Sequence, residues 1–283
     1  MLDLLTKLRH GPLRSLKFLW FLLRFVYRIG LLITPGWHVS KMIGPYGPFK
    51  LDKRFAFSNF SKWGSGHNRG FVSCIDRATG KHTVFDIGAH IGLVTLPIAS
   101  TISAKGTVFA FEPGTSNRKF LEQHLRINEI KNVKVVADLI GEESNDSAIF
   151  YQSSSDSGMN TITETGRRRG YKRTVVRQIT LDEFCSLHQL QPQLMKIDVE
   201  GAELGVLKGA INVLCQHKPT IFLSVHPLHI TESGGSTEEL EQFIKKIGYR
   251  VFDLDGNTVR PTELTEYIVS PAINQETFPR KDL

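Results

Sequence analysis

The chain has 283 residues, of which 41% are hydrophobic and 22% charged, and its formal net charge is +7. Residues 1–50 contain eight of the 35 basic residues and one of the 28 acidic residues, which leaves 27 of each sign in residues 51–283. Because this larger part is neutral, the composition argues against a general nucleic-acid-binding protein, whose domain would itself be basic. It also excludes a predominantly disordered chain.

The N-terminal segment is predicted to be a basic amphipathic helix with a linker, residues 1–48, ahead of a single larger domain, residues 49–283. Its basic residues recur at helical spacing on one stripe, and the remaining surface from residue 16 onward is apolar. This pattern is typical of a helix in a membrane interface, with residues 7–33 making a peripheral membrane contact. Two alternatives are a helix packed on the body or a partner subunit, and an atypical signal-anchor.

A conventional membrane-spanning helix is disfavoured because Arg24 and Arg28 would fall near its middle. The glycines and prolines of residues 44–48 predict a turn-rich linker into the body. We therefore expect a cytoplasmic protein that is held peripherally at a membrane surface if the helix binds lipid.

From residue 82 onward, short β-branched segments alternate with helical patterns. The predicted strands are His82–Ile87, Thr107–Glu112, Val133–Ala137, Leu194–Val199, Thr220–His226, Tyr249–Leu254 and Glu266–Ser270. The predicted helices are Ile91–Ser103, Thr115–Asn128, Leu181–Leu190, Ala202–His217 and Thr237–Ile247. This alternation predicts an α/β fold with a doubly wound, mostly parallel sheet, interrupted between Glu142 and Gln178 by an inserted hairpin region.

The segment Asp86-Ile-Gly88-Ala89-His90-Ile-Gly92 ends the first of these strands and leads into a helix. Its glycines permit a tight turn and a close approach by a ligand, at which the following helix would point its N-terminal amides. The middle glycine of a dinucleotide fingerprint is replaced by His90, and Asp86 would repel a pyrophosphate. A carboxylate at this place suits a cationic amine, so the pattern favours a nucleoside cofactor.

The next strand ends in Glu112-Pro113, where a carboxylate suits hydrogen bonds to both hydroxyls of a ribose. Asp138 follows the third strand, where it either accepts from an adenine amino group or simply opens the next loop. An acid for the amino end, glycines for the middle and an acid for the ribose describe S-adenosylmethionine. The predicted cofactor-binding residues are Asp86, Gly88, Ala89, His90, Gly92, Glu112, Pro113 and Asp138.

The predicted catalytic residues are Lys196, Asp198, Glu200 and His226. The first three alternate along one face of an otherwise apolar strand, where buried charges are costly unless they are paired or used. His226 ends the neighbouring strand at the same sheet edge and is a candidate general base, as is Asp198. Glu203 would cap the following helix or orient these groups, whereas His229 is assigned to a loop.

No metal ligand is assigned. The three cysteines are far apart, and the spacing of Asp198, Glu200 and His226 does not demand a metal, although together they could bind a divalent ion. The basic residues between 167 and 177 indicate either a solvated loop or a landing site for an acidic substrate.

These motifs together resemble the FkbM-type methyltransferases of the class I S-adenosylmethionine-dependent superfamily. The resemblance rests on VFDIGAHIG at 84–92, VFAFEP at 108–113 with RIN at 126–128, ITLDEF at 179–184 and MKIDVEGAELGVLKGA at 195–210. It implies a seven-stranded Rossmann-like sheet with an antiparallel last strand, and O-methylation of hydroxyls. Two positions depart from the family pattern: His90 replaces a common Asn, and Ser224 replaces a common acid.

The sequence thus predicts an S-adenosylmethionine-dependent O-methyltransferase acting on a sugar, a glycan, a glycolipid or a small metabolite. Two alternatives are an NAD(P)-dependent oxidoreductase of Rossmann type and a non-catalytic, membrane-associated binding module.

Overall fold

The computed structural model describes residue 30 and residues 36–153 and 171–272. The predicted N-terminal helix and Arg167, Arg168 and Arg169 lie outside these residues. Within them, every helix is too short or too polar to span a bilayer.

The main sheet has seven strands in the order β11-β12-β10-β9-β3-β4-β5. Neighbours pair in parallel from β10 to β5, while β12 runs antiparallel to both β10 and β11. The strands are β3 (Thr83–Ile87), β4 (Thr107–Phe111), β5 (Val133–Val136), β9 (Leu194–Ile197), β10 (Thr220–Val225), β11 (Tyr249–Phe252) and β12 (Thr265–Pro271). The predicted fold class is therefore confirmed, including the antiparallel last strand.

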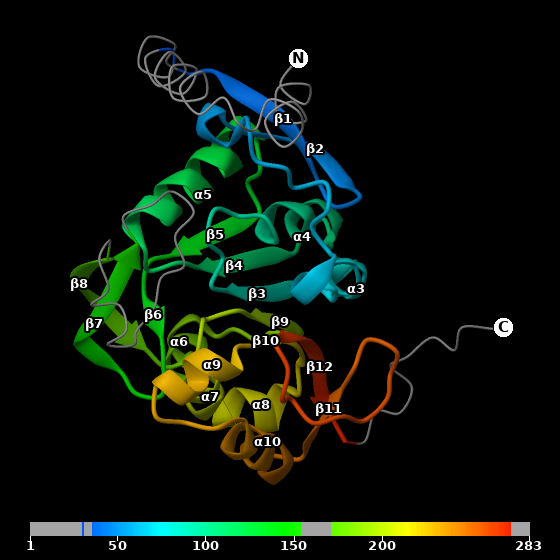
Figure 1. Ribbon diagram of the computed structural model, residues 1–283, viewed down its shortest axis with the longest axis vertical. Helices are drawn as coiled ribbons and strands as arrows, with labels where there is room; N and C mark the ends of the chain where they lie inside the picture. The colour runs from blue at the N-terminus through cyan, green and yellow to red at the C-terminus, as the bar shows by residue number, and fades with distance from the viewer. Residues whose placement is uncertain (1–29, 31–35, 154–170, 273–283) are drawn as a thin grey trace, which may run out of the picture.

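Helices cover both faces of this sheet, as Figure 1 shows. One face carries α3 (Phe71–Ala78), α4 (Thr95–Thr101) and α5 (Thr115–Ile127), and the other carries α6 (Leu181–His188), α7 (Glu203–Lys208), α8 (Ile211–His217) and α10 (Thr237–Lys246). Strand alternation divides the apolar side chains between two cores: Val84 of β3 packs on the α3–α5 face, and its neighbour Phe85 packs on the other.

A β-hairpin, β1 (His38–Ile43) and β2 (Tyr46–Asp52), occupies the segment for which a linker was predicted, so that prediction is wrong there. The glycines and prolines of 44–48 lie partly in the turn and partly in β2. The hairpin is fastened to α5, because the backbone N–H of Lys50 donates to Asn128 and that of Asp52 to His124. Short 3-10 turns at Lys53–Phe55 and Gly66–Asn68 connect it to α3.

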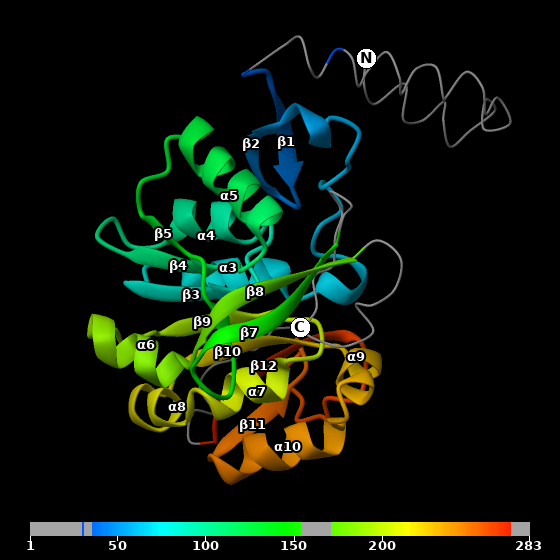
Figure 2. The same cartoon turned by 90° about the vertical axis from the view of Figure 1, so that its left-hand side faces the viewer.

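The inserted region forms a second sheet in the order β6-β8-β7, with β6 (Leu139–Ile140), β7 (Asn145–Ser153) and β8 (Tyr171–Ile179). Strands β7 and β8 pair antiparallel, in the region for which an inserted hairpin was predicted. Figure 2 shows these two strands as a long pair outside the main sheet.

Three helix predictions need correction. The helix expected from Ile91 begins at Thr95, because Pro97 has no N–H and fits only the first turn of a helix. The helix expected over residues 202–217 is two helices, α7 and α8, separated where the Gly209 backbone packs against the carbonyl of Gly141. The segment after His226 is a helix, α9 (Pro227–Glu232), with proline at its first position, rather than a loop.

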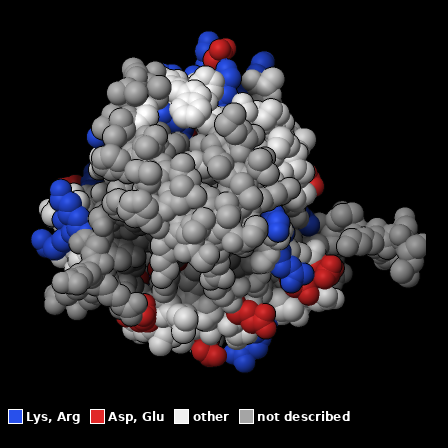
Figure 3. Space-filling model, turned by 45° about the horizontal axis from the view of Figure 1, so that its top comes forward, with Lys and Arg blue, Asp and Glu red and all other residues white. Residues whose placement is uncertain are grey.

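Figure 3 shows one face of the molecule in which the Lys, Arg, Asp and Glu side chains of the described residues gather in small groups around the rim. On this part of the surface the two signs are interspersed rather than joined into one basic stripe. This distribution agrees with the neutral charge balance of residues 51–283.

The hairpin, α5 and the segment after β3 meet at His124, which is fully buried. Its Nδ1 lies 2.8 Å from the carbonyl oxygen of Ile91, and its Nε2 accepts from the N–H of Asp52 at 3.0 Å. This pair of contacts requires the neutral ring with its proton on Nδ1. Burial lowers the pKa of His124 below its ordinary value.

We predict that His124→Leu lowers the free energy of unfolding by about 2–4 kcal/mol, because it leaves two buried backbone groups unsatisfied. Since the pKa is lower in the folded state, the contribution of His124 is present above pH 6.5 and is lost as the pH falls below it. Urea unfolding between pH 5 and pH 8 measures both effects. The exposed His82, changed to Leu, is the control, and an equal loss in the two variants would contradict the prediction.

Candidate active site

The carboxyl ends of β3, β4, β9 and β10 lie at one edge of the sheet, where open α/β sheets bind ligands. The turn after β3 and the charged residues after β9 meet at this edge. The parallel register places Asp86 beside Lys196, so both sequence motifs belong to one site.

The packing of the protein requires glycine at position 88, with or without a ligand. Its φ is +87°, and a Cβ at this position would lie 1.9 Å from the carbonyl oxygen of Asp198. The N–H groups of Gly88 and Ala89 both donate to the carbonyl of Phe111, at the end of β4. Gly92 has a φ of +93°, and a Cβ at this position would lie 2.8 Å from the side chain of Leu121 of α5. The turn is therefore held tightly against both neighbouring strands.

Asp86 is buried beneath this turn, where its Oδ2 accepts from the hydroxyl of Thr95 at 2.5 Å. Burial raises the pKa of Asp86 to about 6, although the Thr95 hydrogen bond and the charge of Lys196 oppose the rise. A cationic group nearby would favour its ionised form.

Glu112 is also buried, and backbone N–H groups donate to both of its oxygens. Oε2 accepts from His90 at 2.9 Å and Oε1 from Gly114 at 2.7 Å. These contacts fix the carboxylate at the end of β4, the position predicted for binding ribose hydroxyls.

The backbone of His90 explains one departure from the family pattern. Its φ is +51°, in the left-handed region where Asn, Asp and His are enriched among non-glycine residues. His therefore fits the conformation that an Asn would adopt there. Burial lowers the pKa of His90 and favours its neutral ring.

Two predicted cofactor residues have other contacts. The carbonyl of Pro113 accepts from the guanidinium of Arg118 at 2.9 Å. Asp138 follows β5 and pairs with Arg177 of β8 at 3.4 Å, on the side of the inserted sheet. Its proposed contact with adenine stays a prediction.

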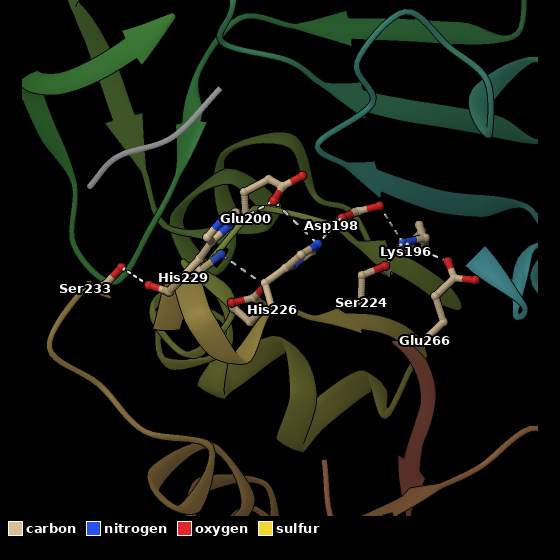
Figure 4. A network of polar contacts seen from close by, with 10 residues as sticks. Lys196, Asp198, Glu200, Ser224, His226, His229, Ser233 and Glu266 are labelled. Carbon is tan, nitrogen blue, oxygen red and sulfur yellow. Dashed lines mark hydrogen bonds and ion pairs between the residues drawn. The ribbon is translucent and has the colours of Figure 1, made fainter. Parts of the chain in front are cut away.

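Lys196 is 1% exposed and is held by three oxygens (Figure 4). Its Nζ lies 2.6 Å from the Ser224 hydroxyl, 3.2 Å from Asp198 Oδ2 and 3.1 Å from Glu266 Oε1. Burial alone would lower the pKa of Lys196, but the carboxylates of Asp198 and Glu266 outweigh it and raise the pKa. Lys196 therefore keeps its charge and holds Asp198 in place.

Glu266 explains the second departure from the family pattern. It lies on β12 directly opposite Ser224 of β10 in the antiparallel register. The carboxylate that pairs with the ammonium of Lys196 therefore comes from β12, the next strand beyond β10, while Ser224 of β10 contributes a hydroxyl.

His226 is oriented by the fully buried Glu203, whose Oε1 lies 2.6 Å from its Nδ1. Its Nε2 points at the other two acids, 3.5 Å from Asp198 Oδ1 and 3.6 Å from Glu200 Oε2. Burial lowers the pKa of His226, but the hydrogen bond that its ring donates to Glu203 and the nearby carboxylates raise it overall. Burial raises the pKa of Glu200, against the effect of His226.

The turn after β9 carries Glu200 at a φ of +50°, an uncommon conformation for glutamate. Such backbone conformations are concentrated at functional sites, where they aim a side chain. Strand β9 ends at Ile197, so Glu200 lies beyond it. The turn, and not the alternation of side chains along the strand, brings Glu200 to His226.

His229 also belongs to the site, which corrects its assignment to a loop. It lies on α9 with its ring stacked on that of His226, 5.8 Å between centroids, and its Nδ1 lies 3.0 Å from Glu200 Oε2. Pro227 was the sequence signal for α9, because proline is common at the first position of a helix. Recognising it would have placed His229 on a helix.

The fold and this site define a class I methyltransferase: a seven-stranded sheet with an antiparallel last strand, a glycine turn after its first strand and an acid after its second. The family model described as the methyltransferase FkbM domain matches residues 86–251, more than half of the chain. The chain therefore belongs to the FkbM methyltransferase family, and S-adenosylmethionine is the cofactor of its class.

Several solved structures resemble the chain. An FkbM methyltransferase from Methylobacillus flagellatus KT is 19% identical over 68% of this chain, with a TM-score of 0.45; the match spans 44% of that protein, less than half of its length. A precorrin-6y C5,15-methyltransferase from Geobacter metallireducens is 14% identical, with coverage of 82% and 97% and a TM-score of 0.41. No curated protein matches the chain.

We predict that Lys196→Met destabilises the protein by about 3–5 kcal/mol, because it leaves the buried carboxylate of Glu266 without a counter-charge. A double-mutant cycle with Glu266→Gln should give a coupling energy above about 1 kcal/mol in urea unfolding. The exposed pair Lys208–Glu142, 3.2 Å apart, is the control and should couple by less than that. Equal coupling in the two pairs would show that Lys196 and Glu266 do not depend on each other.

Proposed function

We propose that the protein transfers a methyl group from S-adenosylmethionine to a hydroxyl of a sugar, a glycan, a glycolipid or a small metabolite. The observation that carries the proposal is the contact between the Gly88 turn and the backbone of Asp198. This contact joins the predicted cofactor turn to the cluster of Asp198, Glu200 and His226. The turn is the expected binding place of the methyl donor, and the cluster suits the hydroxyl that accepts the methyl group.

The residues of the turn fit the cofactor. Glu112 is a fixed, buried acceptor for ribose hydroxyls, and Asp86 is an acid that a cationic amine would keep ionised.

The bound cofactor supplies an electrophilic methyl group on its sulfonium. The protein residues hold the acceptor hydroxyl in line with that group and remove its proton as the new carbon–oxygen bond forms. We assign this step to Asp198 and His226, because the ammonium of Lys196 holds the Asp198 carboxylate and Glu203 directs the Nε2 of His226 toward it. Demethylated cofactor and a methyl ether are the products.

An NAD(P)-dependent oxidoreductase is less well supported, because His90 replaces the middle glycine and Asp86 lies where a pyrophosphate would bind. A non-catalytic module is less well supported because the site retains its carboxylates and His226. A peripheral membrane contact through residues 7–33 stays part of the proposal, resting on their basic and apolar pattern.

We predict that Asp198→Asn leaves S-adenosylmethionine binding within about threefold of the unchanged protein but lowers methyl transfer by 100-fold or more, the scale of general-base catalysis. The assay follows a labelled methyl group into lipid and glycan extracts of the source cells, and calorimetry measures binding. The matched control is Asp146→Asn, whose side chain is 97% exposed. Undiminished transfer by Asp198→Asn would refute the assigned role.

A further inference from the structure

Asp198, Glu200 and His226 converge on one point from two strand ends. Each offers one ligand atom, and the three atoms lie within 4.8 Å of one another. Figure 4 shows their side chains pointing toward each other across the sheet edge. We propose that they form a binding site for a divalent cation that also binds the oxygen of the methyl acceptor.

The spacing of the three atoms fits an ion better than direct hydrogen bonds. His226 Nε2 lies 3.5 Å from Asp198 Oδ1 and 3.6 Å from Glu200 Oε2, longer than good hydrogen bonds. Two ligand atoms at about 2.1 Å from one ion lie about 3.0 Å apart at an octahedral angle and about 3.4 Å apart at a tetrahedral angle, slightly closer than the atoms of this cluster. A small contraction of the cluster would complete the coordination.

The surroundings of His226 are those of a metal ligand. Metal-binding histidines donate their second ring N–H to a carboxylate, which orients the ring and directs the other nitrogen to the ion. Glu203 is fully buried, and its Oε1 lies 2.6 Å from Nδ1 of His226 while also accepting from the N–H of Gly201 at 3.2 Å. This arrangement leaves the Nε2 lone pair for a cation.

The charge balance points the same way. Among the described residues, the carboxylates of Asp198, Glu200, Glu203 and Glu266 pair with the ammonium of Lys196 and with His226 and His229, so with neutral imidazole rings the negative charges outnumber the positive ones. Lys196 contacts Asp198 through Oδ2, on the side away from His226. A divalent cation between Oδ1 of Asp198, Glu200 and His226 would offset this excess. One imidazole and two carboxylates suit Mn²⁺, with Mg²⁺ and Zn²⁺ as alternatives.

The inference rests on the proposed function and deepens it. A hydroxyl bound to the ion has a lowered pKa, so it loses its proton to water more readily, and water reaches the site because the Asp198 side chain is 32% exposed. In this arrangement Asp198 and His226 both serve as ligands of the ion, and water takes the proton in place of either residue. The acceptor oxygen is held beside the Gly88 turn by the contact of that turn with Asp198.

The test is titration of the full chain, stripped with EDTA, with Mn²⁺ alone, in which the electron paramagnetic resonance signal of free Mn²⁺ reports binding. We expect one Mn²⁺ per chain, displaced by Mg²⁺ or Zn²⁺. Asp198→Asn and His226→Ala should each weaken binding at least tenfold, and Asp146→Asn should not. Glu203→Gln should weaken it about 10- to 100-fold, because His226 loses its orientation.

Thermal unfolding of each variant identifies any that fails to fold, and Glu200→Gln, on the turn, replaces such a variant. Absence of Mn²⁺ binding, or equal binding in all variants, would overturn the inference. Calorimetry with S-adenosylmethionine in EDTA separates the two proposals: cofactor binding without Mn²⁺ binding refutes the metal site alone, whereas Mn²⁺ binding without cofactor binding refutes the proposed function alone.

Discussion

The Gly88 turn and the backbone of Asp198 approach so closely that no side chain fits between them. This contact follows from the parallel pairing of β3 with β9 and from a residue that can adopt a φ of +87°. It fixes the distance between the two halves of the site, the turn with Glu112 and the cluster around His226. Any larger residue at position 88 would separate them, so the chemistry depends on this packing.

The second requirement is that each acid buried in the site has a basic partner. Lys196 pairs with Asp198 and Glu266, and His226 pairs with Glu203. Both basic groups are buried, and each is oriented by an acid that is itself buried. The acids that remain turned toward solvent, Asp198 and Glu200, are thus held by partners behind them, and this pre-organisation is what a proton-removing or ion-binding site needs.

Much of the fold followed from the sequence, because strand and helix periodicities are local: the seven main strands were located to within two residues, and the sheet class is confirmed. The β1–β2 hairpin was missed because its glycines and prolines resemble a linker, and its stability comes from α5, which is distant in sequence. The site was predictable where residues share a motif, as with Asp198 and Glu200. Glu266 could not be found, because only the register of β12 against β10 brings it to Lys196.

We propose that one cofactor pocket lies between Glu112 and the Asp198 cluster. A crystal structure of the protein with S-adenosylhomocysteine would locate this pocket. We expect both ribose hydroxyls within hydrogen-bond distance of Glu112 and the sulfur facing Asp198 and His226 across the Gly88 turn. A ligand bound elsewhere, or with its ribose away from Glu112, would contradict it.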